Sequence, residues 1–112
     1  MTTTAEEIEL ELKRAQAARA EGTPGKVRVC ARRAAGAAIR GWLGRRPEPQ
    51  EGWLKGGTEV QHLRLMKDNA RLPESVRGAA GRLATNVQPD HAMPFANDPV
   101  DDARIIIEYL AQ

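Results

Sequence analysis

Apolar residues recur at every third or fourth position in four separate stretches of this chain, and this spacing limits its fold more than any other feature. The stretches cover residues 4–20, 24–43, 58–83 and 98–110. Such a period places apolar side chains along one face of a helix. In the second stretch most residues of the apolar face are small, and the face consists of Val27, Cys30, Ala31, Ala34, Ala38, Gly41 and Trp42. Small side chains allow close packing, so we expect this helix at the centre of the fold.

The ends of these helices carry recognisable signals. Thr4 with Glu7 has the spacing of a capping box, and Thr58 with Gln61 repeats it before the third stretch. The run Gly22–Gly25 contains Pro24 and separates the first two helices by a short link, which favours antiparallel packing. Asp98 followed by Pro99 is typical of an N-cap and a first helical residue.

These patterns predict an all-α fold, an antiparallel up-and-down four-helix bundle that forms a single domain over residues 1–112. Pro73 disfavours helical geometry at Leu72, so we expect a break or kink in the third helix near Leu72. The chain has only two Trp, one Tyr and one Phe, so Ala, Leu, Val and Ile must fill a small core. Its alanine content favours helices over sheets.

Several classes of protein are excluded by composition. Cys30 is the only cysteine, so the chain has no internal disulfide and no zinc site of four Cys or of Cys and His. The two histidines are too few for a His-rich metal centre, and we expect no metal and no cofactor. No segment has the sequence of a signal peptide or the roughly 20 apolar residues of a membrane span. We therefore expect a cytoplasmic protein with no membrane contact.

Three segments resemble parts of the HEPN superfamily, whose members are small helical bundles of bacteria and archaea. They are the alanine-rich segment CARRAAGAAIRGWL (Cys30–Leu43), the segment HLRLM (His62–Met66), and the segment DPVDDARIIIEYL (Asp98–Leu110) that closes the chain. The resemblance covers nearly the whole chain at the level of pattern. It implies a four-helix bundle that binds nucleotides or RNA, or that pairs with a nucleotidyltransferase.

HEPN ribonucleases carry an Arg and a His separated by four to six intervening residues, near the start of the last helix. His91 lies in the corresponding region, but Ala84, Thr85 and Asn86 occupy the positions where the Arg would be expected. The nearest arginine is Arg82, nine residues before His91. Because Asn cannot supply the positive charge that stabilises a scissile phosphate, the resemblance implies an enzyme less readily than a binding protein.

The strongest charge signal lies in and just after the second helix, where no acidic residue interrupts seven basic ones between Lys26 and Arg46. Two interpretations remain open for Arg28, Arg32, Arg33 and Arg40. They can form a surface that binds a nucleotide or RNA, since a field of this sign attracts phosphates. Alternatively, they can form internal ion pairs with acidic residues of the first and last helices, namely Glu7, Glu11, Asp101 and Asp102.

The two long loops contain apolar residues outside the helical stripes: Trp53, Leu54, Met93 and Phe95. They either cover the ends of the bundle or form an interface between subunits, and a homodimer would suit a bundle of this size. His62 is expected to be a structural histidine with a hydrogen-bond partner, and Cys30 an inert core residue.

Together these patterns predict a non-catalytic binding module that contacts a nucleotide, RNA or a nucleotidyltransferase-type partner protein. Two alternatives remain. One is a metal-independent ribonuclease that uses His91 with Arg82, and the other is a structural scaffold without a ligand.

Overall fold

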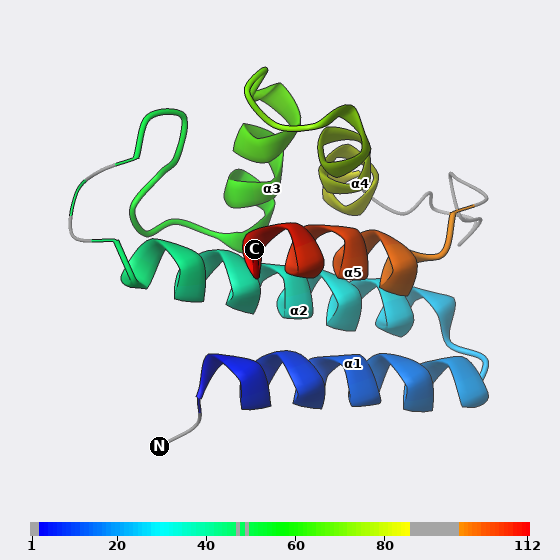
Figure 1. Ribbon diagram of the computed structural model, residues 1–112. Coiled ribbons are helices and arrows are strands. Elements are labelled where there is room, and N and C mark those ends of the chain that lie inside the picture. Colours follow the sequence, from blue (N-terminus) through cyan, green and yellow to red (C-terminus); the bar gives the residue numbers. More distant parts are fainter. Residues whose placement is uncertain (1–2, 47, 49, 86–96) are drawn as a thin grey trace.

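The computed structural model describes residues 3–46, 48, 50–85 and 97–112, and over these residues the chain is all-helical and compact (Figure 1). Its helices are α1 (Thr4–Ala20), α2 (Pro24–Gly44), α3 (Glu59–Asp68), α4 (Glu74–Ala84) and α5 (Pro99–Leu110). The sequence correctly predicted the all-helical class. The third predicted helix is divided into α3 and α4 around Leu72, as Pro73 indicated.

The long helix α2 organises the fold, because α1, α3, α4 and α5 all pack against it. α1 runs antiparallel to α2, and α5 runs in the same direction as α2 (Figure 1). α3 and α4 form a helical hairpin that lies across α2 and α5 instead of alongside them (Figure 1). The described helices therefore form a layer of α1, α2 and α5, with α3 and α4 crossing above it.

Small residues of α2 bring these helices close together. Ala31, Ala34 and Ala35 are fully buried, and Ile39 and Cys30 lie in the core as well. The other large buried side chains come from the surrounding helices, and they are Leu63, Met66, Leu83, Val100 and Ile106. This distribution confirms that α2 is the central helix, packed through alanine against larger side chains of its neighbours.

The helix caps agree with the sequence at two sites and differ at one. Thr58 and Gln61 form a complete capping box, and the carboxylate of Asp98 accepts a hydrogen bond from the backbone of Val100. At α1, however, the cap is Thr3 and the prediction of Thr4 was wrong by one residue. The extended backbone of Thr3 allows its hydroxyl to accept a bond from the Glu6 amide, whereas Thr4 is already helical.

Candidate functional site

Two arginines of α2 bind the C-terminal end of α4. Arg28 donates hydrogen bonds from Nη2 to the carbonyl oxygens of Arg82 and Thr85. Arg32 donates from Nε to the carbonyl of Leu83 and from Nη2 to that of Thr85, the latter at 2.6 Å. These carbonyls belong to the last turn and C-cap of α4, where a helix runs out of backbone donors, and the carbonyl of Arg82 also accepts a bond from the Thr85 amide. The two guanidinium groups therefore cap α4, where the helix dipole also favours positive charge.

This capping differs from both interpretations of the sequence, which placed Arg28 and Arg32 either on a binding surface or in ion pairs with acidic residues. Arg28 is buried, with only 2% of its surface exposed. Burial lowers the pKa of Arg28, and the nearby charge of Arg32 lowers it further, while Asp102 has the opposite effect. Desolvation also lowers the pKa of Arg32. The expected partners of these two residues were carboxylates, but backbone carbonyls hold them.

A second polar contact joins α4 to α5. Arg82 binds both carboxylate oxygens of Asp102, with Nη2 2.8 Å from Oδ1 and Nε 3.0 Å from Oδ2. Asp102 is 2% exposed, so the pair lies at the edge of the core. The hydrogen bond to Asp102 raises the pKa of Arg82. With Arg28 and Arg32, this pair links α2, α4 and α5 in one polar network.

The other two arginines singled out in α2 lie in different surroundings. Arg40 forms an ion pair with Glu7 of α1 at 2.8 Å, as expected, and approaches Glu59 of α3 at 3.6 Å. Arg33 is exposed, and the described residues offer it no ion pair. The four arginines therefore do not form one continuous surface. Their binding of a nucleotide or RNA stays a prediction.

The loop after α2 is held by aromatic packing. Trp53 lies against Trp42, with the ring centroids 4.6 Å apart and the planes tilted by 33°. The guanidinium carbon of Arg46 lies 3.6 Å from the centroid of the Trp42 ring, in a cation–π contact. Leu54 is 39% exposed. Trp53 thus covers the end of α2, and a role of Trp53 and Leu54 in a subunit interface stays a prediction.

Three residues of the predicted sites, His91, Met93 and Phe95, lie outside the described residues. The other histidine, His62, is 3% exposed, and its Nδ1 has no hydrogen-bond partner within the described part of the chain. The expected partner is therefore not found at that atom. Among the described residues, no group of three or more His, Cys, Asp or Glu side chains is placed to hold a metal ion.

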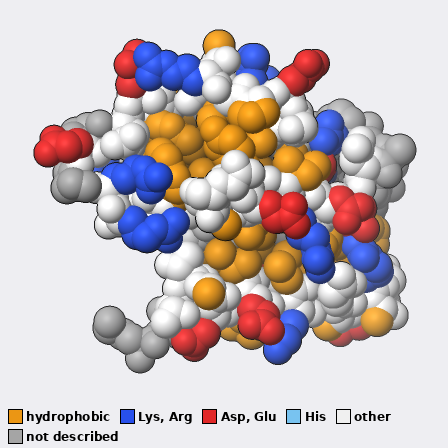
Figure 2. All heavy atoms as spheres, viewed as in Figure 1, with side chains coloured by type: hydrophobic (Ala, Val, Ile, Leu, Met, Phe, Trp, Pro, Cys, Tyr) orange, Lys and Arg blue, Asp and Glu red, His pale blue; other side chains and the backbone are white. Residues whose placement is uncertain are grey.

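A groove between α1 and α5 is the feature that the sequence analysis missed. α1 and α5 both pack on α2, and between them lies a hollow of about 180 Å³. Figure 2 shows apolar side chains gathered in this gap and again on the other side of α5. The residues that line it come from three helices and their ends: Thr4, Ala5, Ile8, Ala38, Arg45, Ile107, Leu110 and Ala111.

The lining of this α1–α5 groove is largely apolar. Ile8 and Ile107 are only partly buried, although both pack against the main core. Ala38 lies between them on α2 and leaves space because its side chain is short. In the sequence, Ile8 and Ile107 have the helical spacing that is typical of core residues. What this spacing could not indicate is that no described helix covers the outer side of these two residues, since this depends on how α1 and α5 are spaced on α2.

Comparison of this chain with protein-family models, with curated proteins and with solved structures finds no match. The resemblance to the HEPN superfamily therefore stays a prediction. Within the described residues, none of the helices combines the length and hydropathy that crossing a membrane requires.

Proposed function

We propose that this chain is a non-catalytic interaction module that binds a protein partner through the α1–α5 groove. The observation that carries the proposal is the groove itself, in which Ile8 and Ile107 remain partly open to solvent between two helices. Exposed apolar surface of this kind, bounded by polar residues, is typical of sites that contact other proteins. The proposal keeps the binding module expected from the sequence and moves its contact surface.

The positions of the arginines favour a protein partner over a nucleic acid. Arg28 and Arg32 already donate to backbone carbonyls, and Arg40 is paired with Glu7. Phosphate binding needs cations that are free to contact the backbone of the nucleic acid. Three of the four arginines expected to do this would first have to leave existing partners, and the two aromatic rings of the loop stack on each other.

The proposal can be tested by site-specific photo-crosslinking in cells that make the protein. A photoreactive amino acid at Ala111, in the groove, is expected to capture one recurring protein. The same group at Val29, which is exposed on α2 and does not line the groove, is the matched control and is expected not to capture it. Equal capture from both positions would contradict the proposal.

Substitutions test whether capture at Ala111 depends on the apolar lining of the groove. Ile107→Ser removes apolar surface from the groove and is expected to abolish capture at Ala111. Leu10→Ser makes the same kind of change at an exposed site of α1 that does not line the groove, so capture should persist. If Ile107→Ser prevents folding, as seen by circular dichroism, Ala5→Arg introduces bulk and charge at an exposed groove residue instead.

The alternatives expected from the sequence can be tested with the same protein sample. Binding of RNA or a nucleotide would give a thermal shift and salt-sensitive affinity, and it should weaken in Arg33→Ala, the exposed arginine of the four. A ribonuclease would cut RNA in EDTA and lose activity in His91→Ala. A scaffold without a ligand would show neither behaviour and no recurring crosslink. A homodimer would capture a second copy of the chain.

A further inference from the structure

We infer that the α1–α5 groove receives an amphipathic α-helix of the partner whose apolar face is flanked by acidic residues. This inference rests on the proposed function and adds the chemistry of the partner. It depends on three features of the groove, namely its shape, its apolar lining and the sign of the charges beside it.

The shape of the groove favours a helix over an extended peptide. α1 and α5 both pack on α2 and run in opposite directions (Figure 1), and the groove is lined by the start of α1, the end of α5 and two residues of α2 and its C-cap. An extended peptide needs backbone partners along its length, and a sheet edge usually supplies them. The described residues form no strand, and side chains line the groove. A helix satisfies its own backbone hydrogen bonds and can present apolar side chains to Ile8 and Ile107.

The apolar lining defines what the occupying face must carry. Seven of the eight lining residues have no charge, and Ala5, Ala38 and Ala111 leave room for larger side chains from outside. A volume of about 180 Å³ can receive branched apolar side chains such as Leu. On a helix these would recur at the i, i+3, i+4 and i+7 positions, which is how helices dock into grooves.

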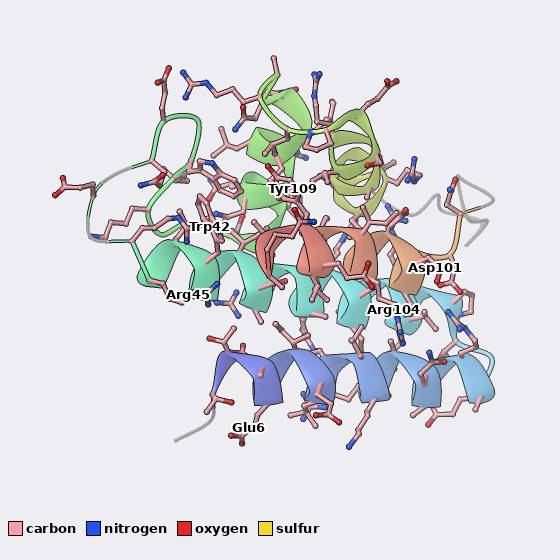
Figure 3. The ribbon with its side chains drawn as sticks, in the orientation of Figure 1. Glu6, Trp42, Arg45, Asp101, Arg104 and Tyr109 are labelled. Carbon is pink, nitrogen blue, oxygen red and sulfur yellow. The ribbon has the colours of Figure 1, made fainter. Side chains whose placement is uncertain are left out.

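Two exposed arginines, Arg45 and Arg104, favour acidic residues on the flanks of that helix. Arg45 is the only charged residue of the lining, and no ion pair joins it to another described residue. Figure 3 shows Arg45 at one end of the gap and Arg104 extending from α5 into the gap farther along. Arg104 is likewise exposed and unpaired within the described residues, and Glu6 points away from the gap in the same view. Opposite charges would fix the register of a bound helix and speed its association.

Synthetic peptides of equal length provide the test. One has Leu at helical spacing with Glu on both flanks, the second replaces every Glu by Lys, and the third keeps the Glu but has a central Pro that breaks the helix. Binding is measured by NMR titration of the full chain at low salt. The acidic peptide is expected to bind at least about tenfold more tightly than the basic one, to shift the amide signals of Ala5, Ile8 and Ile107, and to weaken as salt is added. The peptide with Pro is expected not to bind.

Charge reversal assigns the preference to the groove. Arg45→Glu and Arg104→Glu are each expected to reduce the preference for the acidic peptide, and the double variant should favour the basic one. The matched control is Arg64→Glu, which reverses an exposed arginine of α3 outside the groove and should leave the preference unchanged. Both arginines of the test are exposed, so the variants should fold.

The possible outcomes separate this inference from the proposed function. Equal binding of both charged peptides, binding of the peptide with Pro, or signal shifts outside the groove would overturn the inference. If a partner is still captured at Ala111, the groove is a protein-binding site for a different kind of segment. If no partner is captured and the acidic peptide does not bind, both proposals fail. A second copy captured at Ala111 would replace the acidic helix by self-association.

Discussion

Arg82 and Asp102 form a two-point ion pair that ties α4 to α5, and the carboxylate of this pair is almost completely buried. Removal of Arg82 would leave a negative charge in the interior without its partner. We expect Arg82→Ala to lower the free energy of unfolding by about 2–3 kcal/mol. The measurement is urea denaturation followed by circular dichroism.

The double variant Arg82→Met/Asp102→Leu is the control for this pair, because it removes the unpaired charge as well. It should recover a large part of the lost stability. A single variant as stable as the unmodified protein would show that the pair does not stabilise the contact between α4 and α5.

Arg28 and Arg33 offer a matched comparison within one helix. Arg28→Met removes a guanidinium that caps α4, so the carbonyls of Arg82 and Thr85 each lose a charged donor, and we expect a loss of about 1–3 kcal/mol. Arg33→Met alters an exposed arginine of the same helix and should change stability by no more than about 0.5 kcal/mol. Thermal and urea unfolding of both variants provide the measurement. Equal stability of the two would argue against the capping role of Arg28.

Trp53 is expected to hold the loop after α2 in place. Trp53→Ala removes the packing of this ring on Trp42, and we expect it to destabilise the protein by about 2 kcal/mol and to alter the fluorescence of Trp42. Leu54→Ala, at the neighbouring exposed position, should change stability by less than about 0.5 kcal/mol. If Trp53→Ala is as stable as the unmodified protein, the ring does not anchor this loop, and its predicted role in an interface gains support.

Gly41 lies where α2 meets the start of α1. A Cβ atom built on Gly41 would approach Cγ2 of Thr4 to 2.5 Å and Cβ of Thr4 to 3.1 Å. Alanine usually stabilises a helix interior relative to glycine, by about 1 kcal/mol. Here we expect the opposite sign, with Gly41→Ala destabilising by about 1–2 kcal/mol because α1 must shift.

Two further variants check the reason for this effect. Thr4→Gly in the Gly41→Ala background removes every atom of the clash and should restore part of the loss, which a double-mutant cycle measures. Gly44→Ala is the matched control, since a Cβ at Gly44 meets nothing within 4 Å, and it should be neutral or stabilising. A stabilising Gly41→Ala would mean that α1 and α2 are not packed this closely.

Much of the fold could be predicted from local signals in the sequence. The apolar period over residues 24–43 predicted the bounds of α2 to within one residue, and Asp98 with Pro99 predicted the start of α5. Both signals depend only on residues that are near in the sequence. Thr3 and Thr4 show the limit of this approach. Both can cap a helix, and only the backbone conformation decides between them.

The contacts of the arginines could not be predicted, because they depend on distances between helices far apart in the sequence. Charge patterns suggested carboxylates as partners, and this was correct for Arg40 with Glu7. Arg28 instead binds backbone carbonyls 54 and 57 residues away. A pattern of charged and polar side chains cannot indicate such a contact, because every residue has a backbone carbonyl. The α1–α5 groove could not be predicted either, because it depends on how α1 and α5 are spaced on α2. In the sequence, Ile8 and Ile107 have the spacing of ordinary core residues.

The capping of α4 by Arg28 and Arg32 has a consequence for how this protein can vary. Both side chains recognise backbone oxygens of residues 82, 83 and 85, and every amino acid carries such an oxygen. The end of α4 can therefore exchange its own side chains without losing these bonds, whereas neither arginine can be replaced by lysine with the same geometry. Related chains should hold this pair of positions constant, whereas the constraints on residues 82 and 83 come from their own side chains, which contact Asp102 and the core.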